Sequence, residues 1–134
     1  MNHMKGMQSI LFGESPFLTS SGSVVGKKES EGPLGKKFDI ASDDDLFGEQ
    51  TWEAAESTMQ TMACQLAMKK AGVMPEEIRY LFGGDLLRQG IATSMGVEEL
   101  KIPMFGLFGA CSTSGEAIAL ASMTVAGGYA EQVL

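Results

Sequence analysis

Few residues of this sequence can ligate a metal ion or act as a general base. It contains one histidine, His3, and two cysteines, Cys64 and Cys111, whose spacing matches no zinc-binding pattern. The run Asp43-Asp44-Asp45 lacks the alternating ligands and the distal glutamate of a calcium loop. These absences predict that the chain holds no metal ion and no cofactor of its own.

Basic residues are scarce as well. Ten lysines and arginines stand against 17 aspartates and glutamates, which gives a formal net charge of −7. Because nucleic-acid grooves need clustered positive charge, nucleic acid is excluded as a partner. The sequence also has no run of about 18 apolar residues and no apolar signal-peptide core. We therefore expect a cytoplasmic, soluble protein that reaches a membrane only through partners.

The remaining composition is typical of one folded domain. Of the 134 residues, 44% are hydrophobic and 20% are charged, which provides enough apolar material for a core. We expect residues 1–8 to be disordered and residues 9–134 to form the domain. Residues 20–48 show no period of 2 or 3.6 and are predicted to form a long loop with a basic half and an acidic half. The lysines of this loop either face water or border an anionic ligand or another subunit.

The clearest helix is predicted at residues 51–71. Its first turn is acidic, its last turn is basic, and Gly72 suits the position that follows a helix. Apolar residues recur every three or four positions and define one face, which consists of Trp52, Ala55, Met59, Met62, Ala63, Leu66 and Ala67. Cys64 lies within this helix and is interpreted as a core residue.

A buried strand is predicted at residues 79–82, and it ends at Gly83, Gly84 and Asp85. The paired glycines permit close backbone approach or a positive φ, and Asp85 is left at the carboxyl end of the strand, where α/β proteins bind ligands. Asp85 is therefore a candidate ligand-binding residue. The alternative is that its carboxylate caps the next turn, at residues 86–89.

A strand, a tight turn and a helix are predicted next. The strand covers residues 104–108, and Cys111 lies on the turn. Thr113 and Glu116 form a capping-box pattern, which starts the helix near Ser114. A thiol at this place faces free backbone N–H groups and the positive end of the helix dipole, and both favour the thiolate. Cys111 is a candidate nucleophile, the same place is a candidate anion site, and the alternative is a structural cysteine.

The helix after Cys111 is uncharged in residues 117–126 and apolar on every side. Such a helix is expected to be buried all round, which needs more layers than the other predicted elements supply. Val133 and Leu134 are expected to open another strand. Strands that alternate with helices indicate an α/β fold with a partly parallel sheet. We therefore expect the chain to be the N-terminal part of a larger protein.

Three separated motifs are Glu31-Gly32-Pro33-Leu34-Gly35, Phe82-Gly83-Gly84-Asp85-Leu86-Leu87 and Leu107-Phe108-Gly109-Ala110-Cys111-Ser112-Thr113-Ser114. In this order they resemble the stage V sporulation protein AD family, which belongs to the thiolase-like superfamily. The third motif is similar to the nucleophile elbow of thiolases and ketoacyl synthases. The resemblance runs from Gln8 to Leu134.

The resemblance implies a thiolase-like αβαβα layered fold, of which this chain supplies the N-terminal half or less. It also implies a protein that binds dipicolinic acid, often as its calcium chelate, during uptake into the developing spore. Membrane subunits of the same uptake complex are the implied partners, at the inner spore membrane, and the full-length protein is expected to be a homodimer. The superfamily cysteine corresponds to Cys111, whereas its histidine and asparagine partners belong to the second half.

These inferences leave three functions open. The first is dipicolinate binding, with Phe105 or Phe108 packed on the ring and with the ligand-binding residues Cys111, Ser112, Thr113, Ser114 and Asp85. The second is an acyl-thioester transferase with Cys111 as its catalytic nucleophile and a CoA thioester as cosubstrate. Because the chain offers no usable histidine base, we expect no turnover from it alone. The third is a scaffold that binds only the membrane partners.

Overall fold

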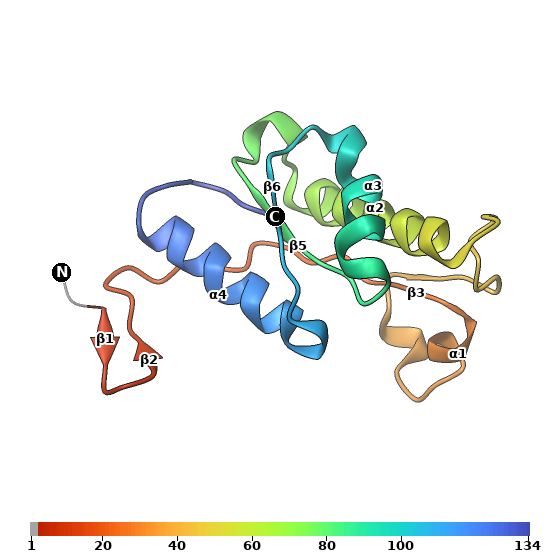
Figure 1. Ribbon diagram of the computed structural model, residues 1–134, viewed down its shortest axis with the longest axis horizontal. Coiled ribbons are helices and arrows are strands. Elements are labelled where there is room, and N and C mark those ends of the chain that lie inside the picture. The colour runs from red at the N-terminus through yellow and green to blue at the C-terminus, as the bar shows by residue number, and fades with distance from the viewer. Residues whose placement is uncertain (1–2) are drawn as a thin grey trace.

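The computed structural model of the protein describes residues 3–134 and shows an α/β arrangement (Figure 1). In chain order, its strands and helices are β1 (Met4–Lys5), β2 (Ser9–Ile10), β3 (Val24–Val25), α1 (Lys27–Ser30), β4 (Ile40–Ala41), α2 (Trp52–Ala71), β5 (Leu81–Gly83), α3 (Ile91–Val97), β6 (Met104–Gly106) and α4 (Thr113–Ala126). Short 3-10 turns lie at Gly35–Lys37, Pro75–Glu77, Arg88–Gly90, Glu98–Leu100 and Ala110–Ser112.

A parallel sheet around β5 is the centre of the molecule. On one side β5 pairs in parallel with β6, so that Leu81 faces Met104 and Gly83 faces Gly106. On the other side the last residues of the chain run parallel to it, since Leu134 N–H donates to the Tyr80 carbonyl at 3.0 Å and Phe82 N–H donates to the Leu134 carbonyl at 2.8 Å. The predicted strand opening at Val133 and Leu134 is therefore confirmed.

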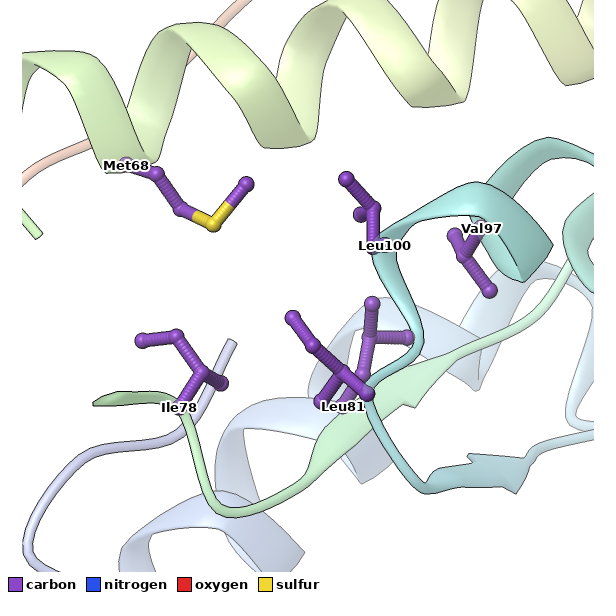
Figure 2. Close-up of a cluster of buried hydrophobic side chains, with 6 residues drawn as sticks. Met68, Ile78, Leu81, Val97 and Leu100 are labelled. Carbon is purple, nitrogen blue, oxygen red and sulfur yellow. The ribbon is translucent and has the colours of Figure 1, made fainter. Parts of the chain in front are cut away.

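The hydrophobic core lies on one face of this sheet. Figure 2 shows side chains from α2, β5 and the region of α3 pointing toward one another. The buried cluster consists of Met68, Ile78, Leu81, Val97, Leu100 and Ile102, with Cys64 packed at its margin. Alternation along β5 explains the arrangement, because Leu81 points to this face while Tyr80 and Phe82 point to the other.

Helix α2 confirms the predicted span with local capping at both ends. The Thr51 hydroxyl accepts from Ala54 N–H at 3.2 Å, and Gly72 closes the helix in the left-handed conformation with φ of 71°. Trp52 does not belong to the buried face, since it is 61% exposed, whereas Ala55 is 2% exposed. The reason is that Trp52 is the first residue of the helix, and the contact with the core begins one turn later.

Helix α4 is not buried on every side. It packs against β5 on the face opposite the core, where Ala117 and Ala121 lie near Phe82, but none of its residues is fully buried. Ile118 is 58% exposed. Among residues 3–134 no further element covers the outer side of α4. Apolar side chains on that side of the helix therefore remain exposed.

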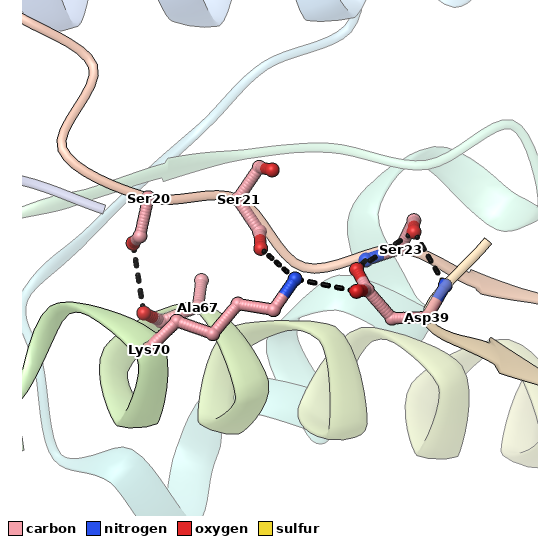
Figure 3. A network of polar contacts seen from close by, with 6 residues as sticks. All are labelled: Ser20, Ser21, Ser23, Asp39, Ala67 and Lys70. Carbon is pink, nitrogen blue, oxygen red and sulfur yellow. Dashed lines mark hydrogen bonds and ion pairs between the residues drawn. The ribbon is translucent and has the colours of Figure 1, made fainter. Parts of the chain in front are cut away.

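The N-terminal segments are more ordered than predicted. Residues 3–8 belong to an antiparallel hairpin in which Met4 faces Ile10, so the predicted disorder at residues 1–8 is wrong for this part; residues 1 and 2 lie outside the described range. The predicted loop at residues 20–48 contains the parallel pair β3 and β4. Figure 3 shows how it is held on α2, since Ser20 Oγ donates to the Ala67 carbonyl at 2.8 Å and Lys70 Nζ bonds Asp39.

Close packing of α2 on α3 generates a first prediction. A Cβ atom on Gly96 would lie 2.6 Å from the Ser57 carbonyl oxygen and 3.0 Å from Ser57 Cα, so a side chain there must push the two helices apart. We expect Gly96→Ala to lower the free energy of unfolding by about 1–3 kcal/mol, measured by urea denaturation.

The matched control is Gly115→Ala in α4, where a Cβ would meet nothing within 4 Å. This variant should leave the stability unchanged or raise it by up to about 1 kcal/mol, because alanine favours helix over glycine. Equal effects of the two substitutions would contradict the tight helix contact.

Candidate functional site

The carboxyl ends of β5 and β6 meet at one edge of the sheet, which brings two of the sequence motifs together. Leu107 N–H donates to the Gly83 carbonyl at 2.9 Å, so the chain leaves both strands side by side. Gly84 then touches the Leu107 carbonyl, and a Cβ on Gly84 would lie 2.8 Å from the Thr113 methyl group. The close backbone approach predicted for the paired glycines is thus observed, and it joins the end of β5 to the start of α4.

An open depression of about 540 Å³ lies at this edge, lined by Asp85, Leu86, Gln89, Phe108 and Ala110. The Phe108 ring forms one wall and is 66% exposed. It rests against Gly90, where an added Cβ would be 3.1 Å from the ring. An exposed aromatic face beside polar groups is suited to a flat ligand.

Backbone strain is concentrated around the depression. Arg88, Gln89 and Ala110 all lie in the left-handed region, with φ of 54°, 56° and 50°. For residues other than glycine this conformation costs about 1 kcal/mol or more each, and it persists only where surrounding contacts impose it. Two of these residues line the depression, so its shape depends on contacts that hold them.

Cys111 lies on the predicted elbow and is exposed, in the 3-10 turn between β6 and α4. It directly follows Ala110 but is not among the residues that line the depression. The nearest helix amides are partly occupied: Ser112 N–H donates to the Gly109 carbonyl at 3.0 Å, and Thr113 N–H donates to that of Ala110. The expectation that these first N–H groups are free is wrong for Ser112 and Thr113.

The predicted capping box is also absent. Ser112 already has helical dihedral angles, so α4 begins at Thr113 and this residue lies inside the helix instead of capping it. The Thr113 hydroxyl oxygen is buried without a hydrogen-bond partner. The Glu116 carboxylate lies beside Gly109, where an added Cβ would be 2.6 Å from Oε2, and Ser114 is exposed one position into the helix.

Asp85 acts as a cap, but it caps the start of α3 and not the turn at residues 86–89 that the sequence alternative named. It is 8% exposed, and its carboxylate accepts from Gly90 N–H, from Thr93 N–H and from the Thr93 hydroxyl at 2.8–2.9 Å. Burial raises the pKa of Asp85, but the hydrogen bonds from Thr93 and Gly90 outweigh it, and the pKa lies below the ordinary aspartate value. Asp85 therefore holds the residues that line the depression and also borders it.

Two glutamates of α2 belong to the surroundings of the site, and sequence reasoning missed them. Burial and the neighbouring charge of Asp85 raise the pKa of Glu56. Its Oε2 atom is buried without a hydrogen-bond partner. Glu53 forms an ion pair of 2.7 Å with Arg88 Nε. In the sequence both glutamates are explained by the helix dipole, and no local signal separates them from other acidic residues at a helix start.

Two further findings concern residues 3–134 only. No group of three or more His, Cys, Asp or Glu side chains in this part of the chain is arranged to hold a metal ion. None of its helices combines the length and the apolar character needed to cross a membrane.

The fold and site define an α/β chain with a strand-to-helix elbow and an open depression at the carboxyl edge of parallel strands. The family model described as Stage V sporulation protein AD matches residues 6–134, so the chain belongs to this family. A curated relative, Stage V sporulation protein AD of Bacillus subtilis (strain 168), is 38% identical over 131 residues. The match covers 98% of this chain and 39% of the relative, so the chain spans about two fifths of the relative's length.

The capping role of Asp85 generates a second prediction. Asp85→Ala leaves the buried amides of Gly90 and Thr93 without an acceptor and should lower the free energy of unfolding at pH 7 by about 3 kcal/mol. Because the pKa of Asp85 is lowered on folding, its contribution is complete above the ordinary aspartate pKa and is lost as the pH falls through the lowered value.

Urea denaturation of both proteins at pH 7 and near pH 3 measures this difference, which should shrink at the lower pH. Asp43→Ala is the control, since Asp43 is exposed. A stability of Asp85→Ala equal to that of the wild type at pH 7 would refute the capping role.

Proposed function

We propose that this chain forms the dipicolinate-binding part of the machinery that takes dipicolinic acid into the developing spore. The observation that carries the proposal is the depression between Asp85 and Phe108, which adjoins the elbow at Cys111. Membership of the stage V sporulation protein AD family supports a role in sporulation. Dipicolinate is a flat aromatic dianion. Its ring can stack on the exposed Phe108 ring at the edge of the sheet, and its carboxylates can face the start of α4.

The chemistry of the edge supports such a ligand in two ways. Phe108 offers a ring face for stacking. The start of α4 offers the positive end of a helix dipole and the exposed hydroxyl group of Ser114 for a carboxylate, whereas the Ser112 hydroxyl already donates to the Gly109 carbonyl at 2.7 Å. The Thr113 hydroxyl is buried without a partner among the described residues, and Thr113 does not line the depression.

Negative side chains favour the calcium chelate over the free dianion. Glu116 lies at the start of α4 beside Gly109, and Asp85 borders the depression. Both repel a bare dianion, whereas the bound calcium ion cancels the ligand's charge. Because the Asp85 carboxylate is engaged by Gly90 and Thr93, its part in binding is to hold the site and to offer its remaining lone pairs.

The proposed partners are the membrane subunits of the same uptake complex and a second copy of the full-length protein. Peripheral association with the inner spore membrane then occurs through those subunits. A second copy is supported by the edge of the sheet, because among the described residues no strand pairs with the outer edge of β6, and Phe105 on this strand is 50% exposed.

Calorimetry with dipicolinate, with and without calcium, tests the proposal on the protein produced at full length. We expect saturable binding that Phe108→Ala weakens about 10-fold, the effect of losing one stacked aromatic contact. The control is Phe17→Ala, because Phe17 is 87% exposed but lines no part of the depression. The absence of saturable heat, or equal effects of the two substitutions, would refute binding at this site.

A second candidate function is acyl-thioester transfer, which the exposed position of Cys111 after the left-handed Ala110 favours. In that case the Cys111 thiolate attacks the thioester carbonyl and CoA leaves as its thiol. Incubation with radiolabelled acetyl-CoA or malonyl-CoA should then label the wild type and not Cys111→Ser.

The matched control is Cys64→Ser, since burial raises the pKa of the Cys64 thiol and keeps it unreactive. If dipicolinate binding is the function, neither CoA thioester labels Cys111. Labelling that persists in Cys111→Ser would exclude the elbow as the place of reaction.

A further inference from the structure

The N-terminal hairpin, residues 3–12, is exposed along its length. Every residue from His3 to Leu11 is exposed, and Met7 at the turn is 93% exposed. Figure 1 shows β1 and β2 at one end of the molecule, clear of the helices and of the sheet around β5. Because a two-stranded hairpin alone is only marginally stable in water, contact with a further surface would stabilise it.

The two faces of the hairpin differ in polarity. Met4 and Ile10 are direct cross-strand partners, so their side chains lie on one face, while Lys5 and Ser9 lie on the other. Met7 follows Gly6, whose φ of 70° suits the tight reversal of the chain. Apolar side chains therefore occupy one face and the tip of the hairpin, and a cation lies close behind the tip.

Charge also distinguishes the hairpin from the rest of the chain. Residues 3–13 contain one lysine, one histidine and no acidic residue, whereas all 17 aspartates and glutamates lie from Glu14 onward. A negatively charged surface therefore attracts this end of the molecule and repels the remainder. The combination of an exposed apolar tip with a nearby lysine matches a surface that offers both hydrocarbon and anionic groups.

We propose that the N-terminal hairpin binds the surface of an anionic lipid bilayer, with Met7 among the acyl chains at the interface and Lys5 at the phosphate headgroups. Apolar burial and attraction to anionic lipid add together in such a contact. The contact is shallow, because β1 and β2 form a two-stranded sheet whose outer edges carry unpaired backbone groups, and these cannot enter hydrocarbon. It is additional to the proposed association through membrane subunits and does not depend on dipicolinate binding.

Cosedimentation of the full-length protein with lipid vesicles tests this contact. We expect stronger binding to vesicles of phosphatidylglycerol and phosphatidylcholine than to vesicles of phosphatidylcholine alone. Met7→Asp should weaken the partition about 10-fold, because it removes the apolar tip and places a negative charge at the lipid. Lys5→Gln should weaken it about fivefold on the anionic vesicles only, which is the effect of one lysine near a charged surface.

The matched control is Met74→Asp. Met74 is 62% exposed and directly precedes the 3-10 turn at Pro75–Glu77, a position that aspartate favours, so this variant should bind vesicles as the wild type does. The inference is overturned if the wild type does not sediment with the anionic vesicles, or if Met7→Asp and Met74→Asp have equal effects. Binding only to vesicles that carry the membrane subunits also overturns it, because the hairpin would then contact protein and not lipid.

Discussion

The contact between Gly84 and the chain that leaves β6 is the constraint on which the candidate site depends. Because Gly84 has no side chain, its backbone reaches the Leu107 carbonyl and the Thr113 methyl group directly. Parallel pairing of β5 and β6 brings the two strand ends to the same edge, but only this close approach places the start of α4 against the end of β5. A larger residue at position 84 would separate Phe108 and Ala110 from Asp85, and the depression between them would be lost.

Features that depend on neighbouring residues in the sequence are predicted well. The ends of α2 follow from Thr51 and Gly72, which act within one turn of the helix. The strand-to-helix elbow at Cys111 follows from an apolar run that passes into small residues. The parallel strand at Val133 and Leu134 also agrees with the alternation of elements along the chain.

Features that depend on tertiary contacts are not visible in the sequence. The capping box at Thr113 and Glu116 has the expected spacing, but Ala110 is left-handed and Ser112 is helical, which moves the helix start by one residue. Asp85 acts as a cap on Thr93, eight residues away. Glu56 already has a local explanation at the start of α2, so its place beside Asp85 gives no separate signal.

The ion pair between Lys70 and Asp39 has a consequence for how the family can vary. Asp39 also accepts from Ser23 N–H at 3.0 Å, so residues 23–41 are tied to α2 largely through polar groups at a water-accessible boundary (Figure 3). None of these groups belongs to the hydrophobic cluster around Leu81. Insertions and deletions in residues 26–30 and 36–38, outside the motif at residues 31–35, should therefore be tolerated during evolution, because they change the length of a segment that lies outside the hydrophobic cluster.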